Sequence, residues 1–149
     1  MIFNPSRDEV RRFFCEVHRK QAAGAVLTPL ESLAADLVAV HPEYDGDLAD
    51  LDAALARDYS VEEGRSNPFL HLAMHLAIAE QVQVDQPPGI RAAVARLAAR
   101  RGDEHAALHE VMEVLGEVMW QAQRAGAPLS VEEMHGRYVD AILARASRG

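Results

Sequence analysis

Residues 28–38, TPLESLAADLV, contain the features that decide the fold class of this chain. Thr28 and Glu31 form a capping-box pattern, in which each side chain accepts a hydrogen bond from a backbone N–H at the start of an α-helix. Pro29 occupies the first helical position, where its missing N–H does no harm. Apolar residues then recur at helical spacing: Leu30, Leu33, Ala34, Leu37 and Val38. The stretch predicts a helix with one buried face.

Comparable helix starts are predicted at four further residues: Ser6, Asn67, Asp103 and Ser130. Expected helix ends lie at Gly24, near Asp85, at Gly102 and near Gly126. Residues 41–47, HPEYDGD, interrupt the helical pattern, residues 48–57 indicate a short helix, and residues 60–66 indicate a loop. Because no stretch alternates with period two, we expect an all-α fold, a single-domain helical bundle of six or seven helices over residues 1–149.

The composition describes an ordinary soluble globular protein. The chain has 149 residues, 49% of them hydrophobic and 26% charged, which is enough to bury a core without disulfides or metals. The one cysteine, Cys15, excludes an internal disulfide and fits a reducing compartment. The first residues lack the pattern of a signal peptide, and no apolar run has the length of a membrane span. We therefore expect a cytoplasmic protein with no membrane partner.

The charge disfavours nucleic acid as a partner. The net charge is −8, so the average surface repels a phosphate backbone. One basic run, IRAAVARLAARR at residues 90–101, has four arginines and no acidic residue. Such a run is most simply the solvated face of a helix.

Two histidine pairs are the most specific feature of the sequence. Residues 71–81, HLAMHLAIAEQ, and residues 105–117, HAALHEVMEVLGE, each contain His-x-x-x-His. In a helix, residues four apart lie on one face and can reach the same ion. Seven histidines placed at random along the chain would give roughly 0.3 such pairs. Two pairs therefore suggest a shared site.

The pairs predict a metal site built from His71, His75, His105 and His109, with Glu113 as a fifth ligand. Neutral imidazoles bind divalent transition metals such as zinc, iron or nickel. This hypothesis requires the four histidine side chains to meet in space. The simpler alternative is that each histidine is a core residue bonded to a backbone carbonyl or a glutamate.

Other polar residues gave weaker indications of a site. His41 and Glu43, in the HPEY stretch, could line a site, although a turn motif is the simpler account of them.

The sequence leaves catalysis open. Neither histidine pair carries the glutamate of the His-Glu-x-x-His peptidases, and Glu-x-x-His, typical of ferritin-like di-iron sites, does not occur. The alternative to metal binding is a metal-free interaction module, in which the histidines are structural. Its arginine-rich helix or an exposed apolar patch would then contact a protein partner or a second copy of the chain.

Several stretches together resemble a known family: FNPSRDEV, TPLESLA, HPEY, SNPFLHLAMHLAIAEQ, DQPPGIRA and VMEVLGEVMWQAQRAG. They are similar to the bacterial proteins grouped as domain of unknown function 1841, over nearly the whole chain. The resemblance implies a helical fold and four histidines of the family pattern, His71, His75, His105 and His109, and it carries no activity. The chain departs from that pattern at His18, where tryptophan is usual, and at Asp45, where a histidine often follows HPEY.

Overall fold

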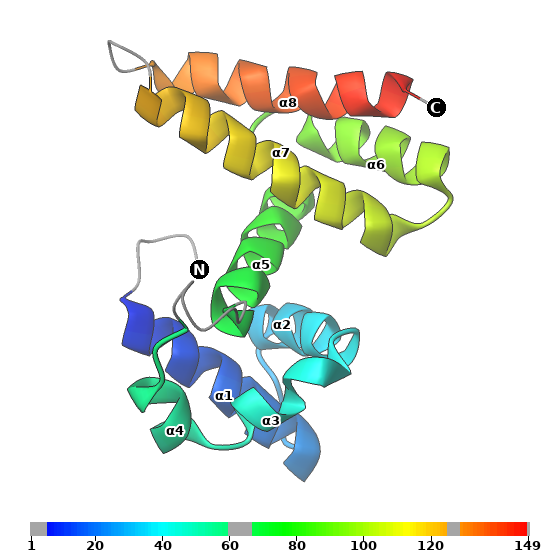
Figure 1. Cartoon of the computed structure of the whole chain (residues 1–149). Coiled ribbons are helices and arrows are strands. Elements are labelled where there is room, and N and C mark those ends of the chain that lie inside the picture. The colour runs from blue at the N-terminus through cyan, green and yellow to red at the C-terminus, as the bar shows by residue number, and fades with distance from the viewer. Residues whose placement is uncertain (1–5, 60–66, 125–128, 149) are drawn as a thin grey trace. The chain divides into compact units, whose positions relative to one another are not determined.

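A computed structural model describes residues 6–59, 67–124 and 129–148. These residues form eight α-helices and one short 3₁₀-helix, and no strand occurs among them (Figure 1). The all-α prediction is confirmed. The chain divides into two compact units, Met1–Ala77 and Ile78–Gly149, called the N-terminal and C-terminal units below. That both belong to one domain over residues 1–149 stays a prediction.

The N-terminal unit is a cluster of short helices around α1 (Arg7–Ala23). In it α1 packs against α2 (Pro29–Ala39), α3 (Asp45–Leu48) and α4 (Leu51–Ala56), and η1 (Pro42–Tyr44) connects α2 to α3. The first half of α5 (Pro68–Val84) completes the unit. Its core includes Phe14, Val17, Ala34, Val38, Leu48, Phe69, Leu72 and Leu76.

The C-terminal unit is a three-helix bundle. Helices α6 (Ile90–Arg101), α7 (Glu104–Arg124) and α8 (Val131–Ser147) all contact one another (Figure 1). Their buried residues include Ile90, Leu97, Val111, Val114 and Ile142. The last turns of α5 join this unit through the Tyr138 hydroxyl, which donates a 2.8 Å hydrogen bond to Gln81 Oε1.

All five predicted helix starts are confirmed by hydrogen bonds at the caps. The side chains of Ser6, Thr28, Asn67, Asp103 and Ser130 each accept a backbone N–H from the first turn of the following helix. At Thr28 the capping box is complete, because Glu31 also accepts from the Thr28 N–H at 2.9 Å. Local side-chain chemistry thus sets where these helices begin.

The helix ends agree with the sequence where the structure describes them. Helix α1 is closed by Gly24 and α6 by Gly102, both with positive φ angles that favour glycine. Helix α5 ends at Val84, directly before Asp85. The predicted loop at 60–66 and the predicted helix end near Gly126 lie outside the described residues.

Residues 41–57 differ from the prediction. The HPEYDGD stretch, expected to break the helical pattern, contains η1 and the one-turn helix α3, which accounts for the eighth helix. The following helix begins at Leu51 rather than Leu48, because the Asp50 carboxylate caps it by accepting from Ala53 N. An aspartate cap within an apolar pattern thus starts this helix three residues later than predicted.

Two of the four arginines in the basic run are engaged within the C-terminal unit. Arg91 donates to the carbonyl oxygens of Val82 and Gln83, and Arg101 forms a bidentate pair with Glu110. These hydrogen bonds connect the run to the rest of the C-terminal unit, so it is not simply a solvated face. No helix in the described ranges is both long and apolar enough to cross a membrane.

Replacing Thr28 by alanine should destabilise the N-terminal unit. The change removes the hydroxyl that accepts from Glu31 N, which is worth about 1 kcal/mol at a helix start. Urea denaturation followed by circular dichroism measures the effect. The matched control is Ser32→Ala, an exposed position inside the same helix, which should leave stability within about 0.5 kcal/mol. Equal effects of the two changes would contradict the capping role.

Glu110→Gln should destabilise the C-terminal unit in a pH-dependent way. Hydrogen bonds from Arg101 lower the pKa of Glu110. They outweigh the partial burial of the carboxylate, which raises the pKa, so the pKa lies below its usual range. Because the folded pKa is depressed, the stabilisation is present above the unfolded pKa, near 4.3, and is lost as pH falls through the folded value. At pH 7 we expect a loss of roughly 1–3 kcal/mol.

The pH series for this variant includes Asp140→Asn, an exposed carboxylate on α8, as its control. The difference between wild type and Glu110→Gln should shrink below about pH 4. A difference that stays constant down to pH 2 would contradict the assignment.

Candidate metal centre

Helix α5 places two imidazoles one turn apart in the N-terminal unit. The ring centroids of His71 and His75 are 4.9 Å apart, and His75 is only 1% exposed. Leu72 and Leu76 on the same helix fill the core of this unit. The pair predicted from the sequence is therefore formed, with His75 at the deeper position.

The HPEY stretch brings a third imidazole to this pair. The His41 N–H donates to Val38 O at the end of α2, and His41 O accepts from Tyr44 N, which closes a tight turn. This turn buries the His41 side chain to 5% exposure. The His41 ring lies 4.7 Å from the His71 ring, and its Nε2 is 3.4 Å from His75 Nε2. Three histidines therefore gather in one unit.

Glu43 and Tyr44 orient the His41 ring. His41 Nδ1 lies 2.9 Å from Glu43 Oε2, and the Tyr44 ring stacks on the imidazole at 5.2 Å with an interplanar angle of 14°. Because an ionised carboxylate only accepts, Nδ1 carries the proton and Nε2 keeps its lone pair. The same hydrogen bond lowers the pKa of Glu43. A carboxylate that holds a histidine in one tautomer is a recurring feature of metal sites.

The distance between the two Nε2 atoms has a chemical meaning. A hydrogen bond between nitrogens at 3.4 Å would be long, since N–H donors usually lie 2.7–3.2 Å from their acceptors. Two nitrogens bound to one tetrahedral zinc ion, each at about 2.05 Å, are separated by about 3.3 Å. A 90° angle at the same bond length would give about 2.9 Å. The separation of His41 and His75 therefore suits a tetrahedral ion better than an octahedral one.

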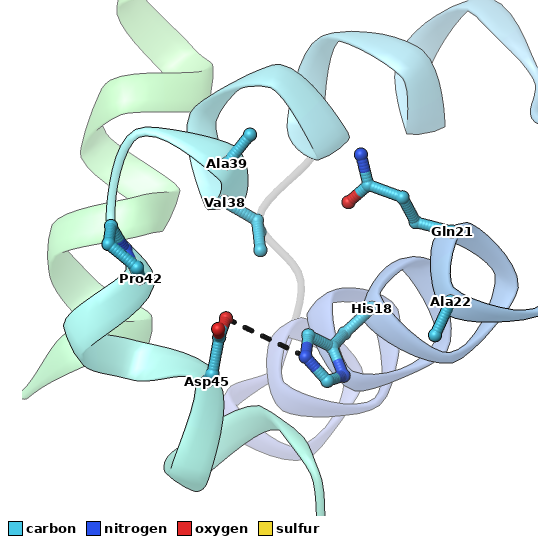
Figure 2. A pocket seen from close by; sticks show the side chains of 7 residues that line it. All are labelled: His18, Gln21, Ala22, Val38, Ala39, Pro42 and Asp45. Carbon is cyan, nitrogen blue, oxygen red and sulfur yellow. Dashed lines mark ion pairs between the residues drawn. The ribbon is translucent and has the colours of Figure 1, made fainter.

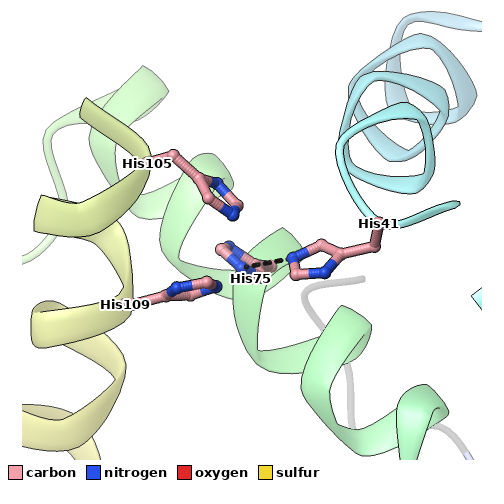
Figure 3. Close-up of side chains that lie close together, drawn as sticks. All are labelled: His41, His75, His105 and His109. Atoms are coloured by element: carbon pink, nitrogen blue, oxygen red, sulfur yellow. Dashed lines mark hydrogen bonds between the residues drawn. The ribbon is translucent and has the colours of Figure 1, made fainter. Parts of the chain in front are cut away.

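The C-terminal unit carries the second histidine pair on α7. The rings of His105 and His109 are 4.2 Å apart, and both side chains are partly buried. Asp103 begins this helix by accepting from His105 N. Figure 3 draws these two imidazoles together with His41 and His75, and each of the four residues offers one ring nitrogen as a potential ligand.

Glu113, the fifth predicted ligand, takes part in an ion-pair network on the C-terminal unit. Its carboxylate accepts from Arg145 Nη1 at 3.1 Å, and its side chain is 64% exposed. The same arginine also bonds to Glu117 and lies near Glu110. Metal binding by Glu113 would have to compete with this network.

The sequence marks His41 as a residue that could line a site, with a turn as the simpler account, and does not place it among the predicted metal ligands. No other histidine lies three or four residues from His41 in the sequence, so the His-x-x-x-His pattern does not include it. The available indication was the proline after it, which favours a tight turn, followed by a glutamate two residues from the histidine. Only the packing of that turn against α5 reveals the contact with His75.

A cavity of about 310 Å³ also lies in the N-terminal unit, lined by His18, Gln21, Ala22, Val38, Ala39, Pro42 and Asp45 (Figure 2). The His18 ring faces the Asp45 carboxylate, with 3.7 Å between Nε2 and Oδ1. The resemblance described above implies that these two residues depart from the family pattern, and the structure places their side chains against each other. In this chain His18 is thus the side chain that lies opposite the Asp45 carboxylate.

The tautomer of His41 can be tested directly. Long-range ¹H–¹⁵N correlation spectra at neutral pH should show His41 protonated at Nδ1, because Glu43 accepts that proton. Glu43→Ala should abolish this preference, whereas Glu16→Ala, an exposed carboxylate on α1, should not change it. Finding the Nε2–H form in wild type would contradict the proposed role of Glu43.

Comparison with known proteins agrees with the resemblance. The model of the family described as "Domain of unknown function (DUF1841)" matches residues 6–142, so the chain belongs to this family. No curated protein and no solved structure matches the chain.

Proposed function

We propose that this member of the DUF1841 family binds one divalent transition metal ion, zinc, through His41, His75, His105 and His109, each with one ring nitrogen. The observation that carries the proposal is the pair of buried Nε2 atoms of His41 and His75, 3.4 Å apart. That separation is typical of two ligands on a tetrahedral ion. Nickel and iron, the other metals suggested by the sequence, commonly favour other geometries.

Two imidazoles fill two of the four coordination positions of a tetrahedral ion. The N-terminal unit supplies His41 and His75, and the proposal assigns the remaining two positions to His105 and His109, which share one face of α7. Because the ion would bind only the folded chain, its loss should be visible as a loss of stability.

The chemistry of the four ligands favours a structural or sensing role. Four protein ligands fill a tetrahedral zinc ion and leave no open position for a substrate, in contrast to catalytic zinc sites. Four neutral imidazoles also leave the charge of the ion uncompensated, and Glu43, bonded to His41, provides a nearby negative charge.

The buried thiol of Cys15 supports our further proposal that the protein works in a reducing compartment such as the cytoplasm.

The proposal differs from the sequence prediction in two ligands. It uses His41 where the spacing alone favoured His71, because His41 has the short approach to His75 and a carboxylate on its second nitrogen. His71 packs against both rings and would shape the site from the side. Glu113 is left in its ion pairs with Arg145.

Metal content is the first test. Untagged protein, purified without added metal, should carry about one zinc ion per chain by elemental analysis. Complete removal of the ion should lower the melting temperature by several degrees, because an ion at a hundredfold excess over its Kd stabilises the folded state by about 2.7 kcal/mol. Only trace metal, together with a melting temperature unaffected by verified chelation, would contradict the proposal and favour the metal-free interaction module.

Variants separate the proposed ligands from their neighbours. His75→Ala and His109→Ala each remove one ligand from a different unit, and each should lose zinc and the response to chelator. His135→Ala, an exposed histidine on α8, is the matched control and should retain both. Zinc retained by His75→Ala and by His109→Ala would show that the pairs do not share the ion.

Comparison of His41→Ala with His71→Ala decides between the two ligand sets. The proposal expects His41→Ala to lose zinc and His71→Ala to keep most of it. Glu43→Gln should weaken zinc binding roughly 10- to 100-fold, the usual cost of losing a partner of a metal-bound histidine. The opposite ranking of the two histidine variants would restore the ligand set predicted from the spacing.

A further inference from the structure

A cavity of about 370 Å³ lies in the N-terminal unit among residues that the metal proposal does not use. It is bounded by α1, by the segment after α4 and by the first turns of α5, and its lining includes Arg7, Arg11, Tyr59, Phe69 and Leu70. Its volume is at the small end of the range for ligand pockets. Two arginines and two aromatic rings around one small cavity call for a chemical explanation.

Arg11 is a buried cation, with only 2% of its surface exposed. Its Nη1 donates to the carbonyl oxygens of Ala54 and Arg57, both at 2.6 Å. A guanidinium has five N–H donors, and these bonds use one nitrogen of three. Among the residues that the structure describes, no carboxylate forms an ion pair with Arg11. A buried charge is normally compensated by one of opposite sign, and here the hydrogen bonds of Arg11 go to backbone carbonyls instead.

Arg7 places a second guanidinium beside the first. Its Nη2 donates to Arg57 O, the same carbonyl that accepts from Arg11. Burial and the charge of Arg7 lower the pKa of Arg11, in agreement with two cations held close together. The ion pair between Arg7 and Asp8 is exposed and long, at 3.5 Å. An anion in the cavity would relieve this repulsion.

The rest of the lining is apolar and aromatic. The Arg11 guanidinium lies over the rings of Tyr59 and Phe69, 5.3 and 5.4 Å from their centroids. Leu70 lines the cavity too and is 58% exposed, so its side chain is accessible to a ligand. Asp58, exposed at the same cavity, disfavours ligands with two negative charges. The lining therefore suits a single negative charge attached to an apolar body.

We propose that this cavity binds a small monocarboxylate with an apolar or aromatic body, its carboxylate held by Arg7 and Arg11 and its body lying against Tyr59, Phe69 and Leu70. Arginine recognises carboxylates through paired N–H donors, and the remaining donors of Arg11 are available for this role. The site lies wholly in the N-terminal unit and does not depend on metal binding.

The test uses the full chain and phenylacetate as the probe. Its matched analogues, phenethylamine and 2-phenylethanol, have the same ring with a positive or no charge. Titration followed by ¹H–¹⁵N spectra should show saturable shifts at Phe69, Leu70 and Ala73 with phenylacetate. The alcohol and the amine should bind at least tenfold more weakly. Phenyl phosphate, a dianion, should also bind more weakly than phenylacetate, because of Asp58.

Variants at exposed lining positions avoid the structural role of Arg11. Arg7→Gln should weaken phenylacetate binding about tenfold, through loss of one charged hydrogen-bond partner. Arg12→Gln, exposed on the same helix and outside the lining, should stay within twofold of wild type. Leu70→Asp should abolish binding by repelling the carboxylate, whereas Val26→Asp, at a position 93% exposed, should have no effect.

Three results would overturn this proposal. They are no saturable shifts with phenylacetate, equal binding of phenylacetate and 2-phenylethanol, and unchanged binding in both Arg7→Gln and Leu70→Asp. Tighter binding of phenyl phosphate than of phenylacetate would overturn the assignment to a monocarboxylate. Circular dichroism of each variant must show native helicity, so that a loss of binding is a local effect.

Discussion

The hydrogen bond between His41 Nδ1 and Glu43 Oε2 is the constraint on which the candidate site depends. It settles which nitrogen of His41 carries the proton, and so directs the lone pair of Nε2 toward His75. A tight turn after α2 makes the bond, with the Tyr44 ring stacked on the imidazole. Without the carboxylate, either nitrogen of the His41 ring could carry the proton. The Nε2 atom that faces His75 would then have no fixed role as donor or acceptor.

The apolar composition of α5 follows from the fact that this helix contributes residues to both units. Its first half supplies Leu72 and Leu76 to the core of the N-terminal unit, and its last turns reach the C-terminal unit through the bond between Gln81 and Tyr138. Helix α5 is apolar almost all round rather than striped, as expected of a helix that contributes residues to the cores of two units. The histidines of this helix are polar groups in a segment selected for burial, and for that reason they need specific partners.

The N-terminal unit compensates its buried polar groups in two ways. The imidazoles of His41 and His75 lie against each other beside one carboxylate, which suits a cation. The guanidinium of Arg11 lies on backbone carbonyls and aromatic rings, next to a second arginine, which suits an anion. Both arrangements follow from the cost of burying charge, and they point to ligands of opposite sign.

The sequence by itself determined the longer helices and five helix starts, because capping side chains and apolar periodicity act over a few residues. Ser6, Thr28, Asn67, Asp103 and Ser130 all cap as predicted. It also found the two histidine pairs, since spacing of four residues places side chains on one helix face. Tertiary structure alone decided that His41 joins His75 and that His18 meets Asp45. These contacts join residues far apart in sequence, or depend on a turn whose geometry is set by what it packs against, and no local pattern encodes them.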